Sequence, residues 1–414
     1  MASLIPDDCI PLIQKYLHFK DFIASRLVSR AFAQNHSHYH GRKRYNHKDP
    51  VPKYLVAIKA GEKVTDETLQ GSPHLRLLHL EDWEETRGVS DDGIRGLRNL
   101  RSLECSYLIT DEGIKDFPKL KCLSVNNLIS DRGVSRLHGL KELYLPYDSI
   151  VTNTGIKNLK KLEVLAFSRG ITDKGLKNLT RLEKLDCSRA ITDIGIRNLT
   201  NLTFLRMAIG SKISNGGVKN LVNLKEIQFG KNINLTGLTH LKLESITYFG
   251  SDDFDANDLN KIPTLETLEC EAITNSELLE LPNLEHLLTR QTIFKGLSRL
   301  LNLNVLVIEK MIVCDDDLLP LVNLQTLKLS KQSENVTDVA ISKMKQLRVL
   351  DLGKSSITGK GLKSLNKLRT LSLGQTELGN GDIENLNLKE LHINSNTNIT
   401  KDCKIFRTIQ GRRK

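Results

Sequence analysis

Cysteine, aromatic side chains and long apolar stretches are scarce in this chain. Of its 414 residues, seven are cysteine and 5% are aromatic. No two cysteines form a Cys-x-x-Cys pair, so we expect reduced thiols in a reducing compartment, the cytoplasm or the nucleus. No apolar run could span a bilayer, and residues 1–17 carry no signal peptide. We therefore expect neither secretion nor contact with a membrane.

Motifs of catalysis are also missing. The chain contains no nucleophile elbow, phosphate loop, zinc-protease helix or kinase signature. The tract from His36 to His40 resembles a metal-binding segment, but no acid or cysteine lies near it, which favours a solvated linker over zinc. We predict no catalytic residue, no cofactor and no metal.

What the chain does contain is a repeat. The pattern Leu-x-x-Leu-x-Leu, or a close apolar variant, recurs sixteen times from Leu75 to Ile393 at intervals of 19 to 25 residues. So short a unit cannot bury a hydrophobic face alone, so neighbouring copies must stack into a solenoid. The copies begin at Leu75, Leu100, Leu120, Leu140, Leu162, Leu182, Leu202, Leu224, Leu243, Leu265, Leu284, Leu303, Leu324, Leu347, Leu368 and Leu388.

Each copy of the repeat predicts a strand with one buried face. In the copy at Leu182, the apolar residues Leu185 and Cys187 alternate with Lys184 and Asp186. The polar residues should face solvent. Cysteines at the equivalent inward positions, as in Cys105 and Cys270, should be buried.

A short helix should follow each strand. In Ile191-Thr192-Asp193-Ile194-Gly195-Ile196, Thr192 is a helix cap, Asp193 belongs to the first turn, and Ile191 and Ile196 occupy the two positions of a hydrophobic staple. Capping therefore explains the many Asp residues at repeat junctions. Several other copies carry the same start.

These features resemble leucine-rich repeats, in particular the variety with an Ile-Thr-Asp-x-Gly-Leu helix start, present here as Ile171-Thr172-Asp173-Lys174-Gly175-Leu176. The resemblance implies an α/β solenoid, a horseshoe with a parallel concave sheet and short convex helices. The chain departs from the longer F-box variety, because Leu108, Gly170 and Ala190 stand where a cysteine is usual, and the Asn of the strand-to-helix bend is mostly absent. We interpret it as a short, tightly wound subtype.

The amino terminus does not repeat. Residues 5–17 begin with Pro6 and two acids and place Ile10, Ile13 and Leu17 on one helical face, and a second helical pattern covers residues 20–32. This region resembles an F-box over residues 4–40: Ile5-Pro6-Asp7-Asp8 matches the Leu-Pro-x-Glu opening, Lys20-Asp21-Phe22 the turn, and Leu27-Val28-Ser29-Arg30-Ala31-Phe32 the second helix. Pro11 and Ser29 depart from the family pattern.

An F-box implies docking to a Skp-type adaptor and, through it, to a cullin of a ubiquitin ligase. The alternative is a purely structural role, in which the N-terminal helices form a cap that covers the open edge of the first repeat. F-box repeat proteins also occur in intracellular bacteria and large viruses, in which case the host cytoplasm is the expected location. The adaptor-binding residues that the family resemblance implies are Pro6, Ile10, Ile13, Leu17, Leu27, Val28 and Phe32.

Four parts therefore follow one another along the chain. Residues 1–40 form the F-box-like helical domain, and residues 41–60 a basic linker with an N-terminal cap helix. The leucine-rich repeats occupy residues 61–398, and residues 399–414 form a C-terminal cap and a basic tail.

The concave face should be acidic. The third, fifth and seventh residues of each copy alternate with the buried leucines and should project from the sheet. Ten acids against four bases give this face −6, although the whole chain carries +11. The acids are Glu81, Glu104, Glu142, Asp186, Glu226, Glu269, Glu271, Glu309, Asp351 and Glu390, and the bases are Lys184, Arg206, Arg290 and Lys328.

Basic side chains should then lie mainly on the convex helices, which disfavours nucleic acid as a partner. Exposed apolar residues among the acids favour a protein substrate with a basic segment, although any single one could be ordinary surface. The predicted substrate-binding residues are Glu142, Tyr144, Val164, Asp186, Phe204, Arg206, Glu226, Phe249, Glu269, Leu288 and Val307.

Two functions fit this sequence. In the first, the chain is the substrate receptor of a Skp-cullin-F-box ubiquitin ligase. In the second, it is a repeat-based protein-binding module or effector with no ligase role. Binding of the adaptor separates the two.

Overall fold

The computed structural model describes most of the repeat region and little before it. The described residues are 57–60, 65–70, 72–80, 88–250, 254–255, 258–274, 281–292, 296–308, 313–329, 334–393, 398–400, 403 and 405. The F-box-like segment of residues 1–40, with all seven predicted adaptor-binding residues, lies outside these ranges, as do Trp83 and the basic tail. The chain divides into two compact units, Met1–Leu182 (unit 1) and Glu183–Lys414 (unit 2).

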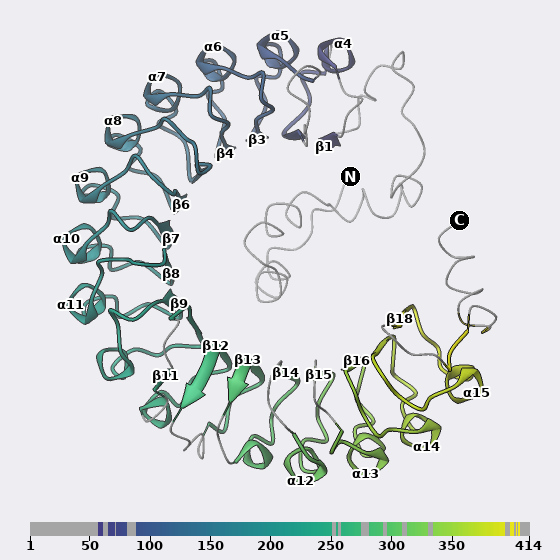
Figure 1. The fold of residues 1–414 in the computed structure, drawn as a ribbon. Helices are drawn as coiled ribbons and strands as arrows, with labels where there is room; N and C mark the ends of the chain where they lie inside the picture. The colour runs from purple at the N-terminus through teal and green to yellow at the C-terminus, as the bar shows by residue number, and fades with distance from the viewer. Residues whose placement is uncertain are drawn as a thin grey trace. The chain divides into compact units, whose positions relative to one another are not determined.

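Unit 1 is a stack of strand and helix pairs, with the strands on one side and the helices on the other (Figure 1). Neighbouring strands pair in parallel in chain order from β1 to β6. The strands are β1 (Ala57–Ala60), β2 (Leu77–Leu80), β3 (Ser102–Glu104), β4 (Cys122–Ser124), β5 (Glu142–Tyr144) and β6 (Val164–Ala166). The helices are α4 (Asp66–Leu69), α5 (Asp91–Ile94), α6 (Asp111–Ile114), α7 (Asp131–Val134), α8 (Asn153–Ile156) and α9 (Asp173–Leu176).

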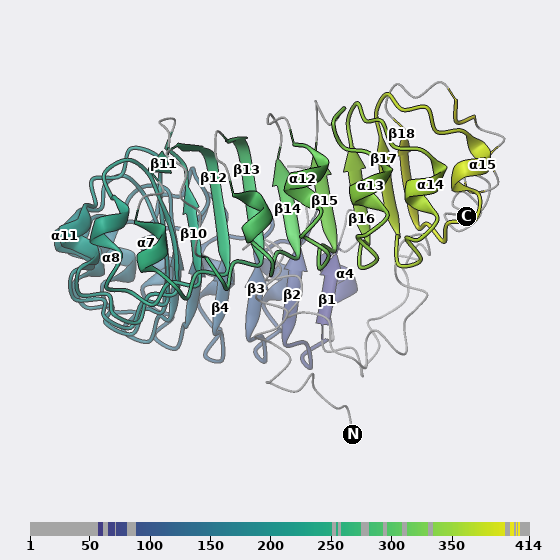
Figure 2. The same ribbon diagram turned by 90° about the horizontal axis from the view of Figure 1, so that it is seen from below.

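Unit 2 repeats the plan over more copies, and its strands from β12 onward lie side by side in Figure 2. Its strands are β7 (Lys184–Cys187), β8 (Phe204–Met207), β9 (Glu226–Phe229), β10 (Ser245–Tyr248), β11 (Phe254–Asp255), β12 (Thr267–Thr274), β13 (His286–Thr292), β14 (Val305–Ile308), β15 (Thr326–Leu329), β16 (Val349–Leu352), β17 (Thr370–Leu373) and β18 (Glu390–Ile393). Its helices are α10 (Asp193–Ile196), α11 (Asn215–Val218), η2 (Leu235–Gly237), η3 (Leu259–Lys261), η5 (Leu297–Arg299), α12 (Asp315–Leu318), α13 (Asp338–Ile341), α14 (Gly359–Leu362) and α15 (Asn380–Ile383).

The structure confirms the strand in each of the sixteen predicted copies, from β2 to β18 without β11. The core is the predicted one as well. In the copy at Leu182, the side chains of Leu182, Leu185 and Ile196 are completely buried, and Cys187 and Leu199 are 1% exposed. At roughly 25 cal/mol for each Å² of apolar surface removed from water, this repeated burial stabilises the stack.

The first strand was not predicted. We expected a cap helix before the repeats, but Ala57–Ala60 form β1, which pairs in register with Leu77–Leu80. A short apolar segment beside the open edge of β2 can satisfy that edge by backbone hydrogen bonds, which a helix there would leave unpaired. The prediction of a helix is therefore wrong for these four residues.

In seven helices, the Asp at the first position binds the next repeat, in addition to its place in its own first turn. Asp111 begins α6, and its carboxylate accepts hydrogen bonds from the backbone N–H (2.8 Å) and the hydroxyl (2.5 Å) of Ser130, the cap of α7. The Ser130 hydroxyl in turn accepts the N–H of Arg132, which is the predicted capping bond. The same bonds join Asp66 to Ser90, Asp91 to Thr110, Asp131 to Thr152, Asp193 to Ser214, Asp315 to Thr337 and Asp338 to Thr358. We call this bond the cap clamp.

In several helices, the glycine at the third position makes room for the clamp Asp of the preceding repeat. A Cβ atom added to Gly133 would overlap the Oδ1 atom of Asp111 and touch the Ile114 side chain. Gly93, Gly113 and Gly361 meet the preceding Asp in the same way. The Thr-Asp-x-Gly motif is therefore one packing unit spread over two repeats.

We predict that Gly133→Ala destabilises the repeats by about 1–3 kcal/mol, because the added methyl group must displace the Asp111 carboxylate from Ser130. The midpoint of urea unfolding measures this loss. Gly96→Ala is the matched control, because nothing lies within 4 Å of a Cβ atom at that exposed position. Equal midpoints for the two variants would contradict the packing role of Gly133.

In the middle of unit 2, 3-10 turns replace the α-helices of the other repeats. Between α11 and α12 the described helical turns are 3-10 turns, η2, η3 and η5. In the same stretch β12 has eight residues and β13 seven, against three or four in most copies. The extra length is paired: Ile273 of β12 lies opposite Thr292 of β13 and Phe254 of β11. The sequence pattern did not predict these longer strands, because the strand continues through Ile273-Thr274, where other copies start a helix.

Candidate protein-binding face

The sheet of unit 2 presents the third and fifth residues of each copy, and seventh residues such as Phe249 and Glu271, on the side away from the helices. We call this side the strand face. Parallel pairing aligns these residues in rows. One row runs from Asp186 through Arg206, Gln228, Thr247, Glu269, Leu288, Val307 and Lys328 to Asp351. A second row aligns Lys184, Phe204 and Glu226. Strands about 4.8 Å apart bring successive members of a row into contact range.

One end of the strand face holds a charged and aromatic cluster. The Arg206 guanidinium lies 3.5 Å from the Asp186 carboxylate and 6.0 Å from the centre of the Phe249 ring. Desolvation by burial raises the pKa of Asp186 above its ordinary value, and the nearby Arg206 charge opposes that rise. The sequence predicted all three residues for one site, and the structure brings them together.

The remaining predicted residues of unit 2 extend from this cluster. Phe204 is half-buried and lies in register with the exposed Glu226 on the neighbouring strand. Further along, Leu288 and Val307 form a half-buried apolar pair. The exposed Glu269 flanks this pair on one side and Lys328 on the other.

The predicted residues of unit 1 are less accessible than expected. Tyr144 is only 8% exposed and Val164 only 7%. Expecting these two as exposed anchors was wrong, because side chains in register on strands about 4.8 Å apart cover one another. Val164 lies opposite Glu142, and the Tyr144 hydroxyl donates to the same Glu142 carboxylate at 3.2 Å.

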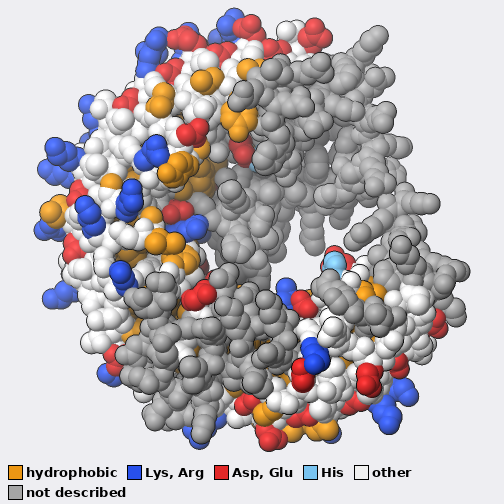
Figure 3. All heavy atoms as spheres, viewed as in Figure 1, with side chains coloured by type: hydrophobic (Ala, Val, Ile, Leu, Met, Phe, Trp, Pro, Cys, Tyr) orange, Lys and Arg blue, Asp and Glu red, His pale blue; other side chains and the backbone are white. Residues whose placement is uncertain are grey.

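The strand face of unit 2 has a negative net charge over its described residues, but a smaller one than the predicted −6. Six acids (Asp186, Glu226, Glu269, Glu271, Asp351 and Glu390) against three bases (Lys184, Arg206 and Lys328) leave −3. Glu81, Glu309 and the side chain of Arg290 lie outside the described residues. In unit 1, Glu104 is in contact with His79 across β2 and β3. Many Lys and Arg side chains stand out from the helix side of unit 1 in Figure 3.

The cysteine prediction is confirmed at two of three positions. Cys187 and Cys270 are buried, and burial raises the pKa of the Cys270 thiol to about 12. Cys105 is only half-buried, because β3 ends one residue before it, at Glu104. All six cysteines in the described ranges are free thiols.

The described residues include neither a candidate metal site nor a membrane-spanning helix. Among the described residues, no group of three or more His, Cys, Asp or Glu side chains could hold a metal ion. No helix in the same ranges is long and apolar enough to cross a membrane.

Sequence reasoning missed one exposed pair in unit 1. Tyr147 is 70% exposed, and the Arg169 guanidinium lies 4.3 Å from the centre of its ring, within cation–π range. Both residues lie in the turns that follow β5 and β6. Their only sequence signal is that each stands seven residues after the first leucine of its copy.

Comparison with known proteins finds similarity to solved structures, but none to a family model or to a curated protein. An internalin from Listeria monocytogenes is 22% identical, with a TM-score of 0.39 over 76% of this chain and 86% of the internalin. A leucine-rich repeat protein from Leptospira interrogans is 18% identical, with a TM-score of 0.44 over 81% and 89%.

A third solved structure is the leucine-rich repeat ectodomain of a plant membrane receptor kinase from Arabidopsis thaliana, in complex with Casparian strip integrity factor 2. It is 15% identical, with a TM-score of 0.46 over 83% of this chain and 50% of that one. In the chain itself, Leu-x-x-Leu-x-Leu strands pair in parallel and lead into short helical turns. The chain has a leucine-rich repeat fold. Its repeats are short, and most of its α-helices are joined by the cap clamp.

We predict that Asp186→Asn makes the repeats more stable at neutral pH. Because the pKa of Asp186 is raised in the folded chain, its contribution to stability is fully present below its unfolded pKa and is lost as the pH rises through the folded pKa. The amide removes this loss. The melting temperature of the variant should therefore be higher than that of the parent chain at pH 7. The two melting temperatures should be equal near pH 4. A variant that melts below the parent at pH 7 would argue against the desolvated carboxylate.

Proposed function

We propose that this leucine-rich repeat protein is a binding module that uses the strand face of unit 2 to hold a protein segment with basic and apolar side chains. The observation that carries the proposal is the clustering of Asp186, Arg206 and Phe249 on that face. Aromatic and Arg side chains beside apolar ones are the composition of binding hot spots.

The chemistry of the partner follows from the charges. Burial removes water from the Asp186 carboxylate, and Arg206 at 3.5 Å offsets only part of that loss. A cation from a ligand would therefore stabilise the ionised carboxylate. Glu226 and Glu269 are exposed acids that would attract the same ligand at longer range. Leu288 and Val307 offer an apolar contact between the charged positions.

The proposal includes no catalytic step. The chain would act only by binding, in the cytoplasm or nucleus. The support for this part of the proposal is that the sequence contains no motif of catalysis.

Charge reversal on the strand face tests this function. We predict that Glu226→Lys with Glu269→Lys lowers the recovery of cross-linked protein partners by about tenfold, because the new lysines repel basic segments. Partners would be cross-linked to the full chain in cells and quantified by mass spectrometry.

The matched control carries the same change of charge on the helix side of unit 2. Asp316→Lys with Glu384→Lys alters two exposed residues of α12 and α15, and should leave recovery unchanged. The strand face would be excluded as the binding site if both double variants behaved like the parent chain.

A second candidate function rests on the F-box resemblance of residues 4–40. In it, the same module selects substrates for a Skp-cullin-F-box ubiquitin ligase, and Pro6 and Leu27 lie in the adaptor contact. The supporting observation is the order and spacing of the matching motifs in the sequence.

Adaptor binding separates the two candidates. We predict that Pro6→Ala with Leu27→Ala abolishes co-purification of a Skp-type adaptor, because both side chains belong to the apolar docking surface implied by the resemblance. Circular dichroism would verify that the repeats remain folded. Failure of the parent chain to bind the adaptor, or equal recovery with the variant, would leave the binding module without a ligase.

A further inference from the structure

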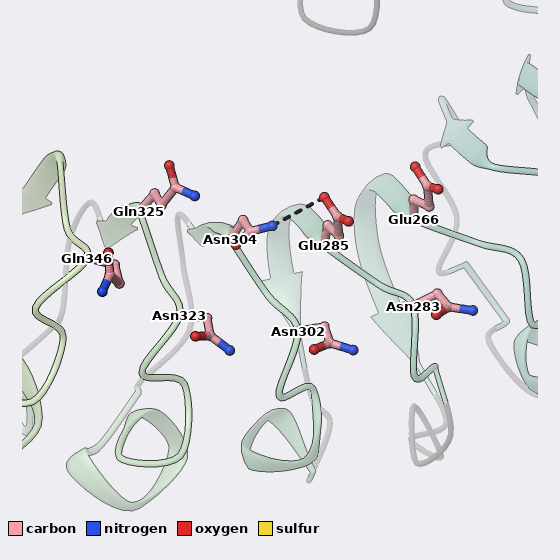
Figure 4. Close-up of a pocket in the computed structure, with 8 residues that line it drawn as sticks. All are labelled: Glu266, Asn283, Glu285, Asn302, Asn304, Asn323, Gln325 and Gln346. Carbon is pink, nitrogen blue, oxygen red and sulfur yellow. Dashed lines mark hydrogen bonds between the residues drawn. The ribbon is translucent and has the colours of Figure 1, made fainter. Parts of the chain in front are cut away.

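A polar groove of about 380 Å³ lies in unit 2, at the edge of the sheet where the strands begin (Figure 4). Its walls are two rows of side chains on either side of the first leucine of each copy. The row before that leucine consists of Asn283, Asn302, Asn323 and Gln346. The row after it consists of Glu266, Glu285, Asn304 and Gln325. All eight side chains are amides or carboxylates.

The first row has a fixed orientation. The Nδ2 atom of Asn283 donates to the Pro263 carbonyl at 2.9 Å, and Asn302 donates to the Pro282 carbonyl at 2.5 Å. Asn323 donates to the Leu301 carbonyl at 3.1 Å. Because a carbonyl can only accept, the amide nitrogen of each Asn must point back to the preceding repeat.

The amide oxygens are therefore the atoms left for the groove. Within the described ranges, the Oδ1 atoms of Asn283, Asn302 and Asn323 accept no hydrogen bond. Three acceptors thus follow one another along three successive repeats.

Amides directly before the first leucine of other copies show which group such an oxygen can bind. In unit 1, Asn99 donates to the Pro73 carbonyl at 2.7 Å, and its Oδ1 atom accepts the Lys119 ammonium at 2.7 Å. Lys119 occupies the equivalent position one repeat later. At the end of the groove, the Gln346 oxygen accepts the Lys367 ammonium at 2.5 Å in the same arrangement.

Within the groove, another Asn follows Asn283 and Asn302 one repeat later, and Gln346 follows Asn323. An amide cannot supply that ammonium. The next Asn donates to a backbone carbonyl instead, so the oxygen before it is left without the cation found at Asn99 and Gln346. The pattern is not universal, because Lys242 does not reach Asn223. Two of the three lysines that follow an amide at this position nevertheless bind it.

The second row adds negative charge. Glu266 and Glu285 directly precede the paired strands β12 and β13, and no Lys, Arg or His is among the described residues that line the groove. In the same row, Arg348 follows Gln325 one repeat later. Lys225 stands two repeats before Glu266 and pairs with Glu244 at 2.7 Å. Asn304 donates to Glu285 at 3.2 Å and fixes one carboxylate oxygen, which leaves the other available.

We propose that this groove binds the guanidinium of an arginine side chain in a peptide segment. An arginine presents five N–H donors in a planar fork, which suits carboxylates and amide oxygens spaced by strands about 4.8 Å apart. A lysine ammonium offers three donors from one point and can reach fewer of these acceptors. The proposal does not depend on the strand face, which uses other residues of the repeat.

Fluorescence anisotropy with the full chain and a labelled Gly-Arg-Gly-Arg-Gly peptide tests the proposal. The probe should bind, and the same peptide with citrulline in place of arginine should bind at least about tenfold more weakly, because citrulline lacks the charge and part of the donor fork. A lysine version should also be weaker. Equal binding of the citrulline or the lysine peptide would overturn the proposal.

Variants of the groove identify the site. Glu266→Gln with Glu285→Gln keeps the shape and should weaken the arginine peptide about tenfold. Asn302→Lys should block it, because the new ammonium would occupy the Asn283 oxygen as Lys119 occupies that of Asn99. Glu163→Gln, which removes a carboxylate of the same row in unit 1 already paired with Lys141, is the control.

Two further outcomes are decisive. Unchanged affinity in both groove variants would overturn the groove as the binding site. Loss of the arginine peptide in the strand-face variant Glu226→Lys with Glu269→Lys, with the groove variants unaffected, would assign the arginine to the strand face instead.

Discussion

The cap clamp is the interaction on which the regular part of this structure depends. One carboxylate, such as that of Asp111, accepts two hydrogen bonds from the cap of the next helix, and the cap hydroxyl accepts the N–H of the second residue of that helix. Hydrogen bonds to a charged group contribute roughly 1.5–3 kcal/mol each. A helix of four residues is far too short to form alone, so each one relies on its neighbour.

The clamp also explains the regions that differ. Asn replaces Asp at Asn153 and Asn380 and keeps the bond to the next cap, with its oxygen accepting the N–H at 2.9 Å. From η2 to η5, within the described residues, no Asp clamp joins the repeats, and 3-10 turns and longer strands take over. Departures from a local rule often mark functional positions. Phe249, Glu269 and Leu288 of the strand face, and Glu266 of the groove, belong to this stretch.

Two surfaces of unit 2 therefore use different positions of one repeat. The third, fifth and seventh residues build the strand face, with Asp186, Arg206 and Phe249 at one end. The residues on either side of the first leucine build the groove, where amides and carboxylates replace apolar contacts. A repeat protein can carry both, because stacking requires only the leucines and the clamp, and leaves the remaining positions free to vary.

The sequence by itself determined the repeat, the sixteen strands, the buried leucines and the capping residues, because all of these follow from periodicity and local backbone chemistry. It also placed Asp186, Arg206 and Phe249 on one face. Only the tertiary structure decided that each Asp serves the following repeat, that Tyr144 and Val164 are covered, and that the Asn283 and Asn302 oxygens point into a groove. Those outcomes depend on which atoms of residues about twenty positions apart come into contact, and no pattern within a single repeat contains that information.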